Sequence, residues 1–579
     1  MPQAVRIGNA HGFWGDRLEA AAEMLALEPE LDYLTLDFLA EVSMAILASQ
    51  RERGERIGYA RDFVEIVTSL VPYWRSGGTC RVITNAGGLN PVACGRACQE
   101  ALERAGCPER KIAIVTGDDV LSQLQQMATS GADTALTRHL DTGEPVSAFS
   151  DRLITANTYL GAQSIAAALA EGANLVITGR VADPSLTVGP CVHHFGWSWN
   201  DWDRLAGATV AGHLIECGTQ VTGGIFTDWL NVPSVDRIGF PIAEVAADGS
   251  CVVAKPRGSG GCVTKLTVKE QLLYEIGDPA AYLSPDVTVS FLSLNVAEES
   301  PDRVRVSGAK GRPAPDHLKV GATYRNGFRA SGQLTILGTN ASRKAQRAAN
   351  VVLRQLEAAG IEFRETLVEL IGGTDDALET LLRISVADDS RESLDRFARA
   401  LMPLITAGPP GTTGYAEGRP KVRPLIDFWP CLIQRELVPY ELHFLTAGTG
   451  SQAAETSNPP GEPVKSRPSG PLAAFEAKCS ETLADIALAR SGDKGRHANI
   501  GVIARDPSGF ERLREELSTA RVAEFLGIAN ADRVRRYELP NLGALNFIIH
   551  DILDSRLRLD SQGKALGQVL LQMPLSNPS

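Results

Sequence analysis

Five loops that each follow a short apolar run hold most of the residues that could perform chemistry together. They combine a His, several carboxylates, side-chain amides and an Arg, which are groups that transfer protons, stabilise an enolate oxygen and hold a carboxylate. A single loop of this kind is more often an ordinary strand exit, because turns need Gly, Asn and Asp. Taken together, the five loops predict one shared site. Their polar residues and glycines are Asn9, His11, Gly12, Gly15 and Asp16; Asp37 and Glu41; Asn85, Gly87, Gly88 and Asn90; Gly117, Asp118 and Asp119; and Thr178, Gly179, Arg180, Asp183 and Ser185.

The first loop, "IGNAHGFWGD", offers a candidate base. His11 lies near Asp16 in the sequence, and a carboxylate can orient an imidazole for proton transfer. A lone His in a strand-exit loop is more often structural, so an Asp of another loop is the alternative. We take His11, Asp16 and Asp118 as the candidate catalytic residues of these loops.

Two further loops could hold an anionic substrate. Arg180 in "TGRVADPS" has a planar guanidinium that matches two carboxylate oxygens; an ion pair with Asp183 explains it equally well. The stretch "TNAGGLNP" offers successive backbone N–H groups at an expected helix start, which could form an anion cradle or a plain turn. The candidate substrate-binding residues here are Asn9, Asn85, Gly87, Gly88, Asn90, Arg180 and Asp183.

The stretch "ALARSGDKGRHANIG", residues 487–501, forms a second charged segment. It is not a nucleotide-binding Walker A loop, because its Ser precedes the Lys and a Gly follows it. Two glycines could still turn the backbone toward an anion, while the acid suggests an ion pair or a proton donor. A charged turn is the alternative. The candidates are Asp493 and Lys494 for catalysis, and Arg490, Ser491, Gly492, Gly495 and Asn499 for substrate binding.

The elements that must position these residues follow a regular order. Through about residue 190, short β-branched runs alternate with helix-period segments such as 61–70 and 158–169, which predicts a parallel sheet covered on both faces. From about residue 220 the pattern becomes mixed α+β, with one amphipathic helix over 342–361. We therefore predict a large α/β domain over residues 1–446.

A Pro-, Gly- and Ser-rich stretch, residues 447–471, has the composition of a flexible linker. It precedes a small α+β domain over residues 472–579. This domain is expected to contain strands in "ETLADIALARS" and "ANIGVIARD", a helix over about 510–527, and strands in "ALNFIIHDIL" and "GQVLLQM".

Composition narrows the function classes. A net charge of −12 argues against nucleic acid as a partner. There is no long apolar run for a membrane span and no signal peptide, so we expect a cytoplasmic protein. The ten Cys form no CxxC pair, no spacing indicates a metal site, and Cys217 has no neighbour that marks it as a nucleophile.

The loops and the tail segment together resemble the acyclic terpene utilisation family, the AtuA-type proteins. The matching stretches include "IGNAHGFWGD", "TNAGGLNP", "TGDD", "ANLVITGRVADPSL" and "KPRGSGG", and the tail "ARSGDKGRHANIGVIAR" resembles the small domain fused to some members. The resemblance implies a catabolic setting with branched acyl-CoA thioesters and hydroxy-carboxylates.

From the residues and this resemblance we expect an enzyme that adds or removes water beside the carbonyl of a carboxylate or acyl-CoA. It would need no tightly bound cofactor, with CoA present only as part of the substrate, and it would form a homo-oligomer. Two alternatives stay open: a thioester or lactone hydrolase, and a non-catalytic accessory protein that binds acyl-CoA or docks a partner.

Overall fold

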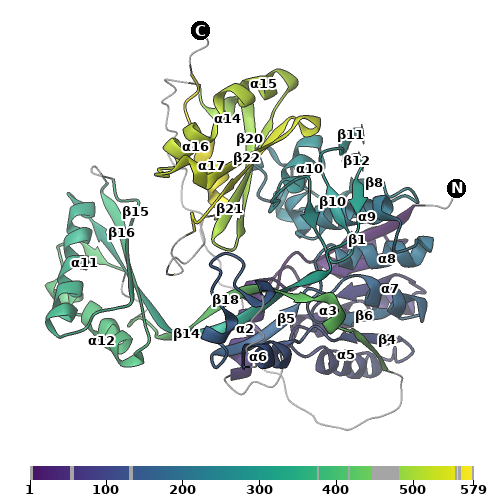
Figure 1. Ribbon diagram of the computed structural model, residues 1–579, viewed down its shortest axis with the longest axis horizontal. Helices are drawn as coiled ribbons and strands as arrows, with labels where there is room; N and C mark the ends of the chain where they lie inside the picture. Colours follow the sequence, from purple (N-terminus) through teal and green to yellow (C-terminus); the bar gives the residue numbers. More distant parts are fainter. Residues whose placement is uncertain are drawn as a thin grey trace.

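The computed structural model describes residues 4–52, 58–129, 135–374, 377–414, 418–445, 481–553, 557 and 563–576 of the 579-residue chain (Figure 1). The predicted linker, residues 447–471, lies outside these ranges. Within them, no helix is long and apolar enough to cross a membrane.

A ten-stranded sheet organises the N-terminal part of the chain. Its order is β11-β12-β8-β7-β1-β2-β3-β6-β4-β19, and β1, β2, β3, β6 and β4 run parallel. These five are the strands predicted before the polar loops. Their bounds are β1 Val5–Asn9, β2 Tyr33–Leu36, β3 Arg81–Thr84, β4 Ile112–Thr116 and β6 Leu175–Thr178; the antiparallel strands are β7 Ile242–Val245, β8 Cys251–Ala254, β11 Asn295–Ser300, β12 Arg303–Ser307 and β19 Glu441–Leu445.

Helices cover both faces of this sheet, as predicted. Successive side chains of a strand point to opposite faces, and in β4 Ile112 and Ile114 join one buried cluster while Ala113 and Val115 join another. Helices α3 and α5 pack in the first cluster, and α7, α8 and α9 in the second. The helices are α1 Ala20–Leu27, α2 Glu41–Glu52, α3 Asp62–Ser69, α4 Val71–Arg75, α5 Pro91–Arg104, α6 Leu121–Thr129, α7 Gln163–Ala170, α8 Ser185–Phe195, α9 Trp202–Ile215 and α10 Lys265–Leu272.

A long strand, β14 (His317–Leu337), leads out of this part into a separate lobe (Figure 1). Its first half pairs with β5 (Leu153–Thr158) and β18 (Arg423–Gln434), and its second half pairs with strands of the lobe. We call residues 328–423 the lobe; it has its own apolar core beneath two helices. Its other elements are α11 Ala341–Ala358, which is the predicted amphipathic helix, β15 Glu365–Ile371, β16 Glu379–Asp388, α12 Arg391–Leu401, α13 Leu404–Ala407 and β17 Thr412–Thr413.

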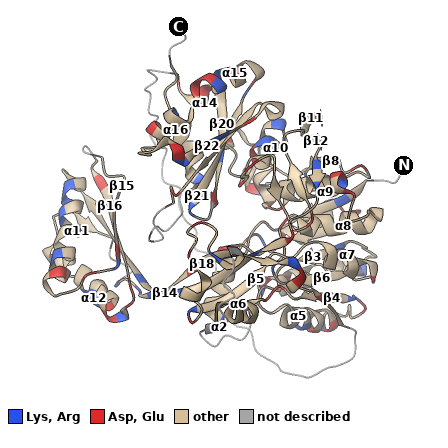
Figure 2. Ribbon diagram, in the orientation of Figure 1, with Lys and Arg blue, Asp and Glu red and all other residues tan. Residues whose placement is uncertain are grey.

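The C-terminal domain is a small α+β unit, as predicted. Its antiparallel sheet has the order β20-β21-β23-β22. Figure 2 shows acidic and basic residues interspersed on its outer helix α15 and on α11 and α12 of the lobe. The elements are α14 Leu483–Ile486, β20 Ala487–Lys494, β21 His497–Ala504, α15 Pro507–Glu516, α16 Thr519–Phe525, β22 Val534–Leu539, β23 Ala544–Ile549 and α17 Leu566–Leu570.

Three details of this domain differ from the prediction. The first predicted strand begins with one helical turn, α14, and the helix expected over 510–527 is two helices, because Ser518 caps the second of them. The stretch "GQVLLQM" contains the short helix α17 instead of a strand, with Gly567 packed closely on the backbone of Ala489.

Candidate functional site

Arg180, in the loop after β6, is the centre of a group of charged side chains at the carboxyl ends of the parallel strands. Its side chain is 4% exposed. Its Nη1 donates to the carbonyl oxygens of Leu39 (2.9 Å) and Val181 (3.1 Å) and to Oδ1 of Asp183 (2.5 Å), so the ion pair with Asp183, the alternative to a substrate clamp, is present. Its Nε and Nη2 donate to no described residue.

Asp37, which follows β2, is linked to Arg180 through the backbone of Leu39. The N–H of Leu39 donates to Asp37 Oδ1 (3.1 Å), while the carbonyl of Leu39 accepts from Arg180. Asn85 fixes the same carboxyl by donating from Nδ2 to Oδ1 (2.7 Å). Burial and the charge of Asp183 hold the pKa of Asp37 well above its usual range. Asp37 is therefore a carboxyl group that holds its proton more tightly than an ordinary Asp does.

A second acid, Glu216, reaches this group from the end of α9. Its charge also raises the pKa of Asp37, which places it close to that carboxyl. Glu216 Oε1 lies 3.1 Å from Nδ1 of His213, and His213 Nε2 lies 3.0 Å from the carbonyl oxygen of Gln271. A carbonyl only accepts, so Nε2 carries a hydrogen, and one more proton is shared between Nδ1 and Glu216. The His213–Glu216 pair is thus a second place where a proton is held.

Asn9 positions Glu216 instead of facing a ligand. Its Nδ2 donates to the carbonyl oxygens of Ile215 (2.5 Å) and Glu216 (3.0 Å), and the side chain is almost completely buried. Asn9 therefore joins the end of β1 to the end of α9, which corrects its predicted role as a substrate-binding residue.

Glu41, Tyr159 and Lys319 continue the group on the other side of Arg180. The hydroxyl of Tyr159 donates to Glu41 (2.7 Å), and Lys319 Nζ lies 3.4 Å from the same carboxylate. Arg180 stacks on the Tyr159 ring at 4.1 Å. Burial opposes ionisation of Glu41, but the charges of Lys319 and Arg180 lower its pKa. We define the strand-end cluster as Asp37, Glu41, Asn85, Tyr159, Arg180, Asp183, Glu216 and Lys319.

Asp118 supports the cluster from behind. Its Oδ2 accepts from the N–H of Arg180 (2.8 Å) and from Nδ2 of Asn157 (2.8 Å), and the side chain packs against Gly179, where a Cβ would not fit. Burial raises the pKa of Asp118 to about 6. Because its contacts are to backbone and amide groups of the protein, Asp118 positions the loop that holds Arg180.

His11 and Asp16 are near enough for the Asp16 charge to act on the ring, but no hydrogen bond joins them in the described structure. His11 is completely buried, stacks on Phe38 at 4.7 Å, and uses Nδ1 to donate to the carbonyl of Ala10 (2.6 Å). Asp16 instead accepts from the N–H groups of Gly12 and Arg17. Burial lowers the pKa of His11, so the ring is a neutral core group.

In the predicted anion cradle "TNAGGLNP", several amides already have acceptors within the protein. The N–H groups of Gly88 and Asn90 donate to the carbonyls of Asn85 and Gly87 in a tight turn. Gly87 has no room for a Cβ beneath the carbonyl of Thr178, and Gly88 has a left-handed φ of 53°. Asn90 caps α5 by accepting from the N–H of Ala93 (3.2 Å). The loop supports the cluster through Asn85.

The tail segment is a strand that joins the two domains, not an open anion-binding turn. Arg490 is buried in β20, where it donates to the carbonyl of Ile225 (3.1 Å) and to Gln220 and covers the Tyr274 ring at 4.5 Å. Gly492 packs against Tyr274 and Glu275 without room for a side chain. The contacted segment directly follows Glu216, so β20 supports one wall of the cluster from outside.

The other tail residues have structural contacts as well. Ser491 accepts from the N–H of Gly567 (2.8 Å). Asn499 is fully buried and bridges the domains: its Oδ1 accepts from the N–H of Glu275 (2.9 Å) and its Nδ2 donates to the carbonyl of Leu273 (2.7 Å). Asp493 and Lys494 end β20, and the turn itself begins at Gly495, beside Asp141.

Neither a nucleophilic thiol nor a metal centre is indicated in the described ranges. Burial and the charges of Glu216 and Glu275 raise the pKa of Cys217 well above its usual value, so the thiol keeps its proton. No group of three or more His, Cys, Asp or Glu in the described part of the chain has the arrangement of a metal site.

The architecture defines an α/β protein with an acid–arginine cluster at the ends of its parallel strands and a docked α+β domain. Comparison with known families gives the particular family. Residues 5–444 match the acyclic terpene utilisation family protein AtuA, and residues 481–576 match the AtuA ferredoxin-like domain. The chain belongs to the AtuA family, and no curated protein matches it. Membership implies a role in acyclic terpene utilisation.

Sequence reasoning placed Arg180, Asp183 and Asn85 in this site and missed several members. The sequence analysis includes Asp37 and Glu41 among the polar residues of the second loop but assigns them no function. Glu216, Tyr159 and Lys319 come from elements far apart in the chain, and no local pattern marks them.

Proposed function

We propose that this protein is a catabolic enzyme that adds or removes water next to the carbonyl of a carboxylate or branched acyl-CoA thioester. The observation that carries the proposal is that the backbone of Leu39 bonds to Asp37 through its N–H and to Arg180 through its carbonyl. One offers a proton and the other offers two unused donors to an anionic oxygen.

In this mechanism Arg180 holds the substrate carboxylate or thioester oxygen through Nε and Nη2, because the planar fork matches such oxygens. Its positive charge opposes the negative charge that develops on an enolate oxygen. Burial alone would disfavour the guanidinium charge, but Asp183 and the other acids raise its pKa well above the usual value.

Asp37 acts as general acid toward the leaving hydroxyl in dehydration, and as base in the reverse direction. A carboxyl with a raised pKa is suited to this exchange near neutral pH. The proton held by His213 and Glu216 gives the cluster a second acid–base group, which a water addition needs on the carbon beside the carbonyl.

The proposal includes no tightly bound cofactor, with CoA entering as part of the substrate, and a homo-oligomeric state in the cytoplasm. Light scattering of the purified full chain checks the oligomeric state; a monomer at working concentration would contradict that part.

The test is turnover of a panel of branched enoyl-CoA and hydroxyacyl-CoA substrates, followed by loss or gain of the conjugated double bond. We expect Asp37→Asn to lower kcat by about 100-fold or more, within the usual effect of losing a general acid. Arg180→Lys keeps the charge but loses the fork, so it should mainly raise KM. The matched controls are Asp236→Asn and Arg237→Gln, both exposed and far from the cluster in sequence. Wild-type turnover by Asp37→Asn would refute the assignment.

A further inference from the structure

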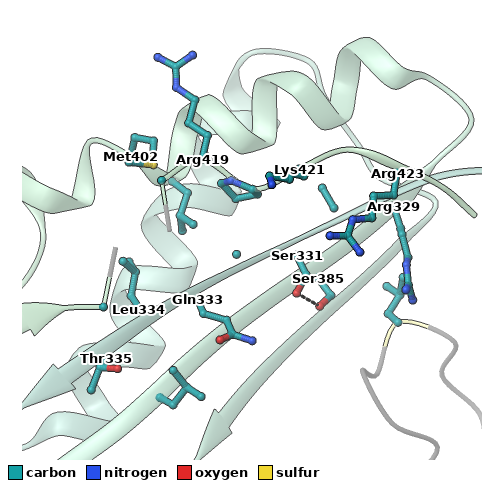
Figure 3. A pocket seen from close by; sticks show the side chains of 18 of the residues that line it. Arg329, Ser331, Gln333, Leu334, Thr335, Ser385, Met402, Arg419, Lys421 and Arg423 are labelled. Carbon is teal, nitrogen blue, oxygen red and sulfur yellow. Dashed lines mark hydrogen bonds between the residues drawn. The ribbon is translucent and has the colours of Figure 1, made fainter. Parts of the chain in front are cut away.

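A cavity of about 740 Å³ lies in the lobe, around the edge of β14 (Figure 3). Four cationic side chains line it: Arg329, Arg419, Lys421 and Arg423. No Asp or Glu is among its described lining residues. This volume is within the range of small-molecule sites in proteins.

The positions of two of these cations are unfavourable without a ligand. Arg329 on β14 and Arg423 on β18 are direct partners in an antiparallel register. Like charges directly opposite each other destabilise a sheet. In the part of the chain that the structure describes, none of the four cations forms an ion pair with a carboxylate. A bound anion would remove this repulsion.

Neutral donors continue the cavity from the cations. The hydroxyls of Ser331 on β14 and Ser385 on β16 bond to each other at 2.8 Å, and Gln333 lies two residues after Ser331 on β14 (Figure 3). Arg and neutral hydrogen-bond donors together are the groups that hold phosphate oxygens.

The other end of the cavity is apolar. In Figure 3, Met402 and Leu334 lie on the opposite side from Arg329 and Arg423. Ile405 lines the same cavity and is 39% exposed. Gly332 lets Leu401 and Pro420 pack directly on the strand, since a Cβ there would collide with both. The cavity therefore offers separate places for a charged head and an apolar group.

We propose that the lobe cavity binds a small organic phosphate or diphosphate that also carries an apolar group. The site shares no residue with the strand-end cluster, so it does not depend on the proposed function. An acyl-CoA belongs to this ligand class, whereas inorganic pyrophosphate represents its head alone.

Calorimetric titration of the full chain tests the proposal with three probes: inorganic pyrophosphate, CoA and octanoyl-CoA. We expect all three to bind, with octanoyl-CoA tighter than CoA. The double variant Arg329→Gln/Arg423→Gln should lose about tenfold or more in affinity for each probe, because each lost charge-assisted bond contributes enough for that change. Ile405→Gln should weaken octanoyl-CoA alone.

The matched control is Arg343→Gln/Arg347→Gln, which removes two exposed cations from α11 of the same lobe. It should bind as the wild type does. Lys421→Gln, at an exposed position, gives a second test that leaves the sheet untouched and should weaken pyrophosphate several-fold. Equal loss in the control, or wild-type affinity in both cavity variants, would overturn the proposal.

Thermal melting separates this site from the strand-end cluster. Without ligand, Arg329→Gln/Arg423→Gln should melt at or above the wild-type temperature, because the repulsion is gone. Pyrophosphate should raise the Tm of the wild type and of Arg180→Lys, but not of the double variant. Loss of the pyrophosphate shift in Arg180→Lys, with retention in the double variant, would place the anion at the strand ends and refute the lobe site.

Discussion

Positive charge is arranged in opposite ways in the strand-end cluster and in the lobe cavity. Arg180 is 4% exposed, stacks on Tyr159, and bonds through Nη1 to two carbonyls and Asp183. Arg329 and Arg423 face each other across two strands and form no ion pair with a described residue. Arg180 has its carboxylate partner within the protein and leaves only one edge of the guanidinium unbonded. The two lobe arginines would obtain negative charge only from a bound anion. The same residue type thus contributes to stability in one place and opposes it in the other.

Removing one cation from each region should give the largest difference in the free energy of unfolding between the two regions. Arg180→Gln leaves the carbonyls of Leu39 and Val181 without their donor, at about 1–3 kcal/mol each, and removes the ion pair with the partly exposed Asp183. Arg423→Gln should change the free energy of unfolding by at most about 0.5 kcal/mol, in the stabilising direction. Urea denaturation midpoints measure both; equal destabilisation by the two variants would show that the lobe cations are bound as tightly as Arg180.

The second-largest expected effect is a pH dependence of stability that comes from the strand-end cluster and not from the lobe. Asp118 supports the cluster and has a folded pKa of about 6, above its value in the unfolded chain, so the folded protein binds the extra proton. Its contribution is fully present at low pH and is lost as pH rises from about 4 to about 6, on the order of 2–3 kcal/mol. Asp118→Asn should flatten this part of the Tm–pH curve, while Asp236→Asn should leave it unchanged. An unchanged slope in Asp118→Asn would show that another group carries it.

A smaller effect is expected at the junction that joins the C-terminal domain to the cluster wall. Asn499→Ala leaves the N–H of Glu275 and the carbonyl of Leu273 buried without partners, which costs about 1–3 kcal/mol. Hydrogen exchange should become faster at residues 273–277 and stay unchanged in the lobe. Faster exchange in the lobe as well would mean that the two regions are stabilised together.

The smallest effect belongs to the partly exposed contact between His497 and Asp141, in which Nε2 and Oδ1 lie 3.5 Å apart. The hydrogen bond from His497 lowers the pKa of Asp141, so this contact stabilises the fold above the ordinary pKa of an Asp and is lost as pH falls. Asp141→Asn should reduce stability by less than about 1 kcal/mol, and salt should reduce the difference further. Thermal melts at two salt concentrations measure it; a larger, salt-independent loss would indicate a fully buried pair.

The five parallel strands and both covered faces could be predicted from the sequence, because β-branched runs before polar loops indicate buried parallel strands directly. Arg180 and Asp183 could be predicted for the same reason, since parallel strands bring their carboxyl ends together. The roles of His11 and of the "TNAGG" amides could not, because only the packed structure shows that His11 Nδ1 and the N–H of Gly88 already bond to backbone carbonyls.

The remaining errors also come from long-range contacts. The cluster needs Glu216 from α9 and Lys319 from β14, which no periodicity links to Arg180. The tail segment has the composition of an anion-binding turn. In the structure, however, Arg490 and Asn499 bond to residues of the N-terminal part of the chain, and the local sequence does not indicate these partners. The sequence does not indicate the lobe as a separate unit, because the single strand β14 contributes residues to two apolar cores.

That shared strand has a mechanical consequence. Between Arg325 and Phe328 the register of β14 against β18 shifts, and Gly327 has a left-handed φ of 80°. The ten residues from Phe328 to Leu337 form an arm about 33 Å long at about 3.3 Å per residue, so a bend of about 10° at Gly327 would displace the arm's far end by about 6 Å. Lys319, which contacts Glu41, and the lobe residues of β14 therefore belong to one continuous strand, with Gly327 between them.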